Sequence, residues 1–160
     1  MHAYAGIGSR RLSESQLEAC RQVAHRAAGA GWRLHTGAAT GADQAFAEGA
    51  LEVGGAVSLF LPWWSYEQDW VRWAKGRGAL AFVLRDDDQN AWASVSSHPA
   101  ADRLSRGAQA LHARNFCIIR DCSWVAAFPV LDRYGHRGGT GQGILLAEQR
   151  GLPVLDLSTL

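Results

Sequence analysis

The chain has 160 residues and a formal net charge of +1, and 48% of its residues are apolar. The length suits one domain with a substantial core, and so high an apolar fraction excludes a disordered chain. The longest apolar run, residues 56–64, is far shorter than the roughly 20 residues that span a bilayer. Because the first residues hold no apolar segment typical of a signal peptide, we expect a cytoplasmic protein with no membrane partner.

Strand-like and helix-like segments alternate along the chain. Apolar runs and glycine stops predict strands at 2–7, 32–35, 56–61, 79–84, 123–128 and 153–157. Helical spacing predicts helices at 14–28, 42–53, 65–75, 99–120 and 141–150. Ser13 and Gln16 have the spacing of a capping box at the start of the first helix. This alternation predicts an α/β fold with a doubly wound, mostly parallel sheet and helices on both faces.

Three of the predicted strands lead into loops rich in glycine and small polar residues. The loops are GIGSR at 6–10, HTGAATGAD at 35–43 and HRGGTGQG at 136–143. In a doubly wound sheet such loops leave from the carboxyl edge, where ligands bind at the reversal of strand order. The sequence therefore predicts that the three loops surround one cleft.

The residue types in these loops suit an anionic ligand. Helix N-termini offer free N–H groups and partial positive charge, and glycine lets the backbone approach a phosphate closely. Arg10 can supply a bidentate charge, whereas Asp43 either contacts a ribose or base or caps the second helix. Hydroxyl donors are available from Ser9, Thr36 and Thr140. Neither GxxxxGK[ST] nor a GxGxxG after the first strand occurs, so a standard phosphate-binding loop is excluded.

Two further groups of residues have more than one interpretation. Trp63, Trp64, Trp70 and Trp73 lie within 11 residues, and they can form a base-stacking platform, an oligomer interface or a cover for the core. Residues 85–90, RDDDQN, are predicted to form a solvated turn. The three cysteines form no CxxC and the histidines are scattered, so we expect neither a metal site nor a cofactor.

The motifs at both ends of the chain resemble those of a known superfamily. They are YAGIGSR at 4–10, HTGAATGADQAFAEGA at 35–50, LPW at 61–63, HPAADRLSRGAQALHARN at 98–115 and GGTGQGILLAEQRGLPVLDL at 138–157. In order and spacing they resemble the superfamily that joins the Rossmann domain of DNA-processing protein A (Smf) to the Lonely-guy enzymes. The chain looks closest to its short, single-domain phage and prophage members. Residues 64–97 fall outside these motifs and are expected to form a variable insertion.

The resemblance implies a single Rossmann-like domain over residues 1–160 that binds nucleotides or related phosphates at the three loops. Arg114 and Asn115 match an Arg–Asn pair in the single-strand-binding region of the DNA-processing branch. Arg114 also matches an arginine that, in the Lonely-guy branch, works with a glutamate of a GGxGTxxE motif to cleave an N-glycosidic bond. The glutamate position falls at Gly143 or Leu145 here, so Asp43 is the remaining carboxylate candidate.

The main hypothesis is therefore a protein that binds, and so senses or sequesters, a nucleotide or nucleotide-derived phosphate. One alternative is a nucleoside-monophosphate N-glycosidase, with Arg114 and Asp43 as catalytic candidates, and another is a single-stranded DNA binder. The resemblance and the tryptophans also suggest a homo-oligomer, for which we expect a dimer. The candidate ligand-binding residues are Gly8, Ser9, Arg10, Thr36, Gly37, Gly41, Asp43, Arg114, Asn115, Gly138, Gly139, Thr140 and Gln142.

Overall fold

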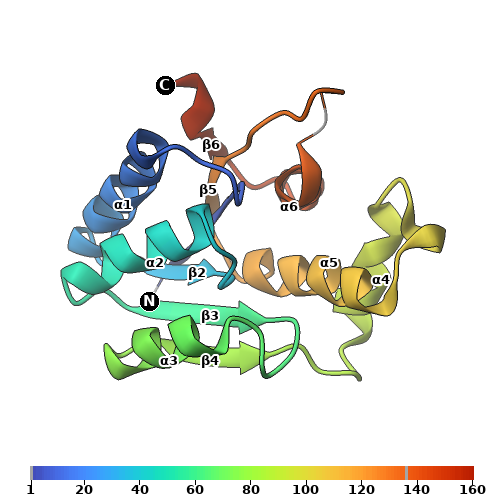
Figure 1. The fold of residues 1–160 in the computed structure, drawn as a ribbon, viewed down its shortest axis with the longest axis horizontal. Coiled ribbons are helices and arrows are strands. Elements are labelled where there is room, and N and C mark those ends of the chain that lie inside the picture. Colours follow the sequence, from blue (N-terminus) through green and yellow to red (C-terminus); the bar gives the residue numbers. More distant parts are fainter. Residues whose placement is uncertain (1, 136) are drawn as a thin grey trace.

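A six-stranded, all-parallel sheet forms the centre of the structure, a computed structural model that describes residues 2–135 and 137–160 (Figure 1). The strands lie in the order β4-β3-β2-β1-β5-β6, so the strand order reverses between β1 and β5. The fold is thus a doubly wound α/β fold of the Rossmann type, as the sequence predicted. The strands are β1 (Ala3–Gly8), β2 (Arg33–Thr36), β3 (Val57–Leu61), β4 (Leu80–Val83), β5 (Trp124–Phe128) and β6 (Val154–Asp156).

Helices cover both faces of this sheet because successive side chains of a strand point to opposite faces. On β1, Tyr4 packs into the core with α1 and α2, whereas Ala5 and Ile7 pack into the core with α5 and α6. The first face carries α1 (Glu14–Gly29), α2 (Ala42–Glu52) and α3 (Gln68–Gly76). The second carries α5 (Arg106–Ile119) and α6 (Gly138–Gln149), with α4 (Gln89–Ser94) beside α5 (Figure 1).

The ends of several helices follow the caps that the sequence carries. Ser13 and Gln16 form the predicted capping box, with the Gln16 N–H donating to the Ser13 hydroxyl at 3.3 Å. The predicted helix at 99–120 is wrong in its first part: α5 begins at Arg106, and the Ser105 hydroxyl accepts from the Ala108 N–H. Short 3-10 turns, Val95–Ser97 and Ala101–Arg103, precede it. The last helix, α6, begins at Gly138, three residues before its predicted start.

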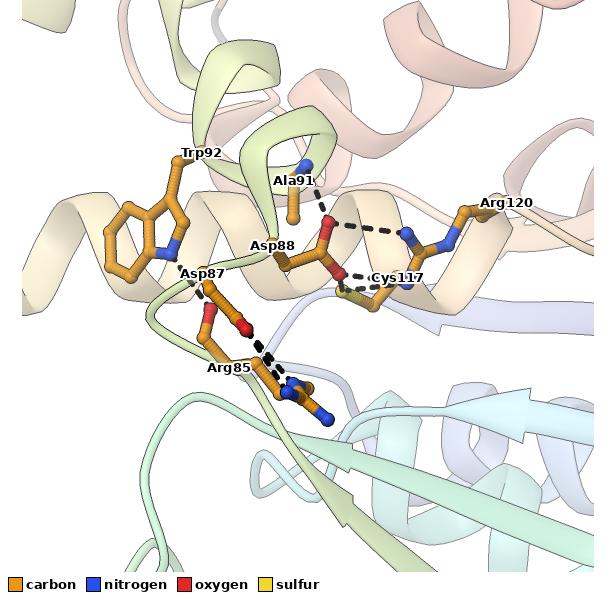
Figure 2. Close-up of polar contacts among 7 residues, drawn as sticks. All are labelled: Arg85, Asp87, Asp88, Ala91, Trp92, Cys117 and Arg120. Carbon is orange, nitrogen blue, oxygen red and sulfur yellow. Dashed lines mark hydrogen bonds and ion pairs between the residues drawn. The ribbon is translucent and has the colours of Figure 1, made fainter.

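A carboxylate at the turn after β4 anchors the short helix α4 to α5. Asp88 Oδ1 accepts from the Ala91 N–H at 3.1 Å and Oδ2 accepts from Arg120 Nη2 at 2.9 Å (Figure 2). Partial burial opposes ionisation of Asp88, but the hydrogen bonds from Arg120 and Ala91 outweigh it and lower its pKa. The prediction of a solvated turn at 85–90 therefore fails at Asp88, whose side chain is 17% exposed, although Asp87 is 72% exposed.

Replacing Asp88 by alanine should release α4 from the body of the domain. The change removes a helix cap and both bonds to Arg120, and we expect a loss of about 1–3 kcal/mol of unfolding free energy. Hydrogen exchange of the amides in Gln89–Ser94 should accelerate accordingly. The matched control is Asp87→Ala, because Asp87 is exposed and pairs only locally with Arg85. Equal protection of α4 in the two variants would contradict the assigned role of Asp88.

Candidate functional site

A cleft of about 470 Å³ opens at the carboxyl edge of the sheet, beside the ends of β1 and β5, where the strand order reverses. It lies between the loop after β1, the first turn of α2, the middle of α5, the loop after β5 and the first turn of α6. The lining residues are Ile7, Gly8, Ser9, Arg10, Arg11, Ala39, Asp43, Leu111, His112, Arg114, Asn115, Ile118, Val130, Leu131, Asp132, Arg137, Gly138, Gly139, Thr140 and Gly143.

Nine of the thirteen candidate residues from the sequence line this cleft. They are Gly8, Ser9, Arg10, Asp43, Arg114, Asn115, Gly138, Gly139 and Thr140. The other four lie behind it. The buried Thr36 hydroxyl donates to the Gly6 carbonyl at 2.6 Å, and Gln142 Nε2 donates to the Ser94 carbonyl at 3.5 Å. Gly37 packs against the Asp43 and Arg114 side chains, and Gly41 packs against the backbone of Ser9 and Arg10. His136 of the third loop lies outside the described residues.

Backbone hydrogen bonds to neighbouring elements hold the loop after β1 in place. The Ser9 N–H donates to the Phe128 carbonyl at 3.0 Å, and the Ser9 carbonyl accepts from the Ala42 N–H at 3.1 Å. A Cβ at Gly8 would lie 2.4 Å from the Ala42 Cβ, and one at Gly41, where φ is +92°, would lie 2.6 Å from the Ser9 carbonyl oxygen. These glycines let β1, the end of β5 and the start of α2 meet at one point.

Asp43 and Arg114 come from different helices and lie together at the base of the cleft. Both are buried, with 7% and 4% of their surfaces exposed. A Cβ at Gly37 would lie 2.5 Å from Asp43 Oδ2 and 2.8 Å from Arg114 Nη1, so both charged groups pack against this one glycine. Only glycine leaves room for them at this position.

The Arg114 guanidinium is fixed in place by three neighbours. Nη1 donates to the Phe60 carbonyl at 3.0 Å, Nε donates to Asn115 Oδ1 at 3.3 Å, and the group lies 5.3 Å from the centre of the Tyr66 ring. The Tyr66 hydroxyl accepts from Arg10 Nη2 at 3.2 Å. Tyr66 thereby links Arg10 and Arg114, a role that the sequence did not indicate.

Burial raises the pKa of Asp43 to about 6, although Arg114, the Ala39 amide and Arg10 each favour its ionised form. Asp43 occupies the first turn of α2, whose N-cap is Gly41, so the interpretation of Asp43 as the cap residue is not what the structure shows. The positive end of the helix and two arginines surround a carboxyl group that changes charge near neutral pH. A group of this kind can accept a hydrogen bond or transfer a proton.

The stability of the folded chain should decrease between about pH 4 and pH 6 through Asp43. Its pKa is about 6 in the folded protein against an ordinary value of 3.8, so the folded state holds this proton more tightly than the unfolded state. Stability from this group is therefore greatest below about pH 4 and falls as the pH rises through the window. Asp43→Asn lacks this titration.

Urea unfolding of the two proteins at pH 3.5 and pH 7 measures the effect. On going to pH 7, Asp43→Asn should gain on the order of 2–3 kcal/mol relative to the parent protein, since each pKa unit corresponds to about 1.4 kcal/mol. A constant difference in unfolding free energy between the two proteins across this range would show that the Asp43 pKa is unshifted.

The cleft carries more positive than negative side chains. Arg10, Arg11, Arg114 and Arg137 line it, against Asp43 and Asp132. Arg11 and Arg137 are not among the residues predicted from the sequence, although Arg11 directly follows the first loop and Arg137 lies within the third. By helix geometry the first turn of α6 adds backbone N–H groups that have no partner within the helix, and the Gly141 N–H bonds back to the Arg137 carbonyl. This combination suits a bound anion.

The tryptophan cluster lies elsewhere. Trp70 packs partly buried against the core, whereas Trp63, Trp64 and Trp73 are 39%, 67% and 37% exposed. Of the described residues that line the cleft, none is a tryptophan.

Within residues 2–135 and 137–160, no group of three or more His, Cys, Asp and Glu could hold a metal ion. Across those same residues, no helix has the length and apolar character required to cross a membrane.

Three solved structures resemble the chain over 96–99% of its length. DNA processing protein A from Helicobacter pylori, described for its single-stranded DNA binding mode, aligns with a TM-score of 0.63 and 17% identity over 63% of its own chain. The Moco carrier protein of Chlamydomonas rheinhardtii aligns with a TM-score of 0.58 and 19% identity over 77% of its chain. A structural-genomics target, TM1055, aligns with a TM-score of 0.58 and 18% identity over 72% of its chain.

The likeness to these proteins is one of fold. No protein-family model matches the sequence, and no curated protein matches it significantly. The chain spans less than two thirds of the Helicobacter protein, so the likeness concerns one part of that molecule. Together with the strand order, these alignments confirm that the chain has a Rossmann-like fold, which it shares with the Helicobacter and Chlamydomonas proteins.

Proposed function

We propose that the chain binds a nucleotide or a nucleotide-derived phosphate in the cleft at the carboxyl ends of β1 and β5. The observation that carries this proposal is the convergence of Arg10, Arg114 and Arg137 with the first turn of α6 at the switch point of the sheet. Cations and free N–H groups recognise phosphate, and the switch point is where such folds bind ligands. A cleft of about 470 Å³ is also within the usual range for small-molecule sites.

Two parts of the cleft offer different chemistry to the two parts of a nucleotide. The phosphate would bind the first turn of α6 and the guanidinium groups of Arg10, Arg114 and Arg137. The sugar or base would lie toward Asp43, whose carboxyl group can accept from a hydroxyl or a ring N–H. In a cytoplasmic protein, such a site would serve to sense or sequester a nucleotide-derived signal.

Calorimetric titration with nucleosides and their mono-, di- and triphosphates tests the proposal. We expect a phosphate-bearing member to bind and its nucleoside to bind at least 10-fold more weakly. Arg10→Ala should weaken that binding about 10-fold, because a hydrogen bond to a charged group contributes roughly 1.5–3 kcal/mol. Arg26→Ala, in the last turn of α1, is the control and should bind like the parent protein. No binding by any member of the panel would contradict the proposal.

A second candidate function is hydrolysis of the N-glycosidic bond of a nucleoside monophosphate. The observation that favours it is the buried Asp43 beside Arg114, because a carboxyl group with a pKa of about 6 is suited to proton transfer near neutral pH. Chromatography of the nucleotide panel after incubation would reveal free base. Asp43→Asn should abolish that release while phosphate binding persists. Binding without release of base assigns the chain to the binding class alone.

The third alternative, binding of single-stranded DNA, follows from the fold shared with the Helicobacter protein. Affinity for an oligonucleotide should then fall steeply as salt increases, since phosphate contacts release counterions. Competition between the oligonucleotide and the best mononucleotide would show whether both use the cleft. A response that does not depend on salt would exclude this alternative.

A further inference from the structure

The strand β4 leaves one face and one edge of the sheet uncovered. It is the last strand on its side, and no neighbouring strand lies beyond it in the part of the chain that is described (Figure 1). Ala81 and Val83 pack against the core that contains α3. Their neighbours Leu80 and Phe82 point to the opposite face, where they are 50% and 48% exposed. The edge therefore presents two large apolar side chains to solvent.

The backbone of this edge has hydrogen-bonding groups directed outward. The Leu84 N–H donates to the Leu61 carbonyl at 2.8 Å, and the direction of the backbone groups alternates along a strand. The backbone N–H and C=O groups of residues 80, 82 and 84 consequently point toward β3. Those of Ala81 and Val83 point away from the sheet. An edge of this kind is a template for another strand.

A second apolar surface lies on the α3 side of the same edge. A groove of about 230 Å³ there is lined by Trp64, Val71, Lys75 and Ala81, among others. Trp64 is 67% exposed, and Lys75 Nζ lies 5.5 Å from the centre of its ring. Trp64 thus exposes apolar surface on one side of the edge, and Leu80 and Phe82 expose it on the other.

The two ends of β4 carry opposite charges. Lys75 and Arg77 lie just before the strand. Just after it, Asp86 and Asp87, whose side chains are 98% and 72% exposed, outnumber Arg85, which pairs with Asp87 at 2.9 Å. An antiparallel pair of identical strands brings the basic end of one copy to the acidic end of the other. A parallel pair would bring like charges together, which is unfavourable.

We propose that a second copy of this chain binds antiparallel along β4 and continues the sheet across a twofold axis. The twofold axis requires the outward-facing Ala81 and Val83 to pair with outward-facing residues of the second copy. Pairing of Ala81 with Val83 of the second copy satisfies all these groups and places Phe82 opposite its own symmetry mate. Two other twofold registers are less favourable. Ala81 opposite Ala81 would set Val83 against Ala79, whose N–H already donates to the Ala74 carbonyl, and Val83 opposite Val83 would set Ala81 against Arg85, whose carbonyl already accepts from the Asp88 N–H.

The size of the contact explains why the flanking side chains matter. Stable interfaces bury about 1,600 Å² in total, more than four residues of strand can supply. Leu80 and Phe82 on one face and Trp64 on the other would enlarge the contact. This assigns an interface role to Trp64, independently of any ligand in the cleft.

Sedimentation equilibrium over a range of protein concentrations tests the proposal. We expect a dimer that dissociates on dilution, and a monomer for Phe82→Arg, or for Leu80→Lys if the first variant does not fold. The control is Leu155→Arg on β6, which is 39% exposed at the opposite edge of the sheet and should leave the dimer intact. A monomeric parent protein, a dimeric Phe82→Arg or equal dissociation of Leu155→Arg would each overturn the proposal.

Oxidative cross-linking tests the strand register separately. Directly opposed residues have Cβ atoms about 5 Å apart, so Phe82→Cys should form a covalent dimer on mild oxidation. The native cysteines Cys20, Cys117 and Cys122 are buried and should not interfere. Leu155→Cys should remain monomeric on a non-reducing gel. A failure of the folded, dimeric Phe82→Cys protein to cross-link would overturn the pairing of Phe82 with its symmetry mate.

Discussion

Arg114→Ala should weaken binding of the phosphate-bearing ligand by about 100-fold or more. The guanidinium is held by the Phe60 carbonyl and Asn115, so it is oriented toward the cleft before a ligand arrives. Removing a charge-assisted contact costs roughly 1.5–3 kcal/mol, and about 2.7 kcal/mol corresponds to 100-fold. The change also removes the strongest nearby cation that favours the ionised form of Asp43, so the pKa of Asp43 should rise further.

Two further variants on the same helix make this measurement specific. Arg114→Lys keeps the charge, but it cannot reproduce the planar fork that spans two acceptors, so we expect an intermediate loss of affinity. Arg106→Ala removes an arginine from the first turn of α5, where the side chain is 70% exposed, and should not change binding. Circular dichroism of each protein establishes that it is folded before titration. Unchanged affinity in folded Arg114→Ala would place the ligand elsewhere.

Gly49→Ala should cost about 3 kcal/mol of unfolding free energy or more. Gly49 lies in α2, and a Cβ there would lie 2.2 Å from the carbonyl oxygen and 2.6 Å from the Cα of Arg21 in α1. These are backbone atoms within a helix, so the two helices would have to move apart and loosen the core around Phe46. Such overpacking typically costs 1–3 kcal/mol, with larger values where the backbone itself is the obstacle.

The matched control is Gly29→Ala at the end of α1, where an added Cβ would meet open space. Alanine is the better helix former, so this variant should be unchanged or up to about 1 kcal/mol more stable. Urea unfolding monitored by circular dichroism compares the three proteins. Equal stabilities for Gly49→Ala and the parent would mean that the helices α1 and α2 are not in close contact at Gly49.

The sequence predicted the strands and the larger helices because their apolar periodicity and glycine stops are local signals. It missed α4, and it extended α5 too far toward its N-terminus across residues 99–105. A long-range contact decides the structure at α4, whereas a local cap sets the start of α5. Asp88 caps α4 and bonds to Arg120, and Ser105 supplies a cap that competes with continuation of the helix. Neither Arg120 nor its distance from Asp88 can be read from the local sequence.

For the candidate site, the sequence alone determined that three glycine loops lie on one edge, because parallel strands all end there. It also indicated Arg10, Asp43 and Arg114 as the groups with chemistry to offer. Whether each residue lines the cleft was decided by the tertiary structure. Thr36 and Gln142 instead bond to backbone carbonyls, since a buried polar group must find a partner.

The glycines show most clearly which requirements are visible in the sequence and which depend on the tertiary structure. At positive φ, as at Gly41, its need is partly visible in the sequence as a turn. At Gly37 and Gly49 the need comes from atoms far away in the chain: the buried Asp43 and Arg114 in one case and the Arg21 backbone in the other. The sequence by itself determined the order of the elements and the edge that carries the chemistry. Only the tertiary structure decided which groups are buried together, because burial and charge pairing depend on neighbours that the chain brings near by folding.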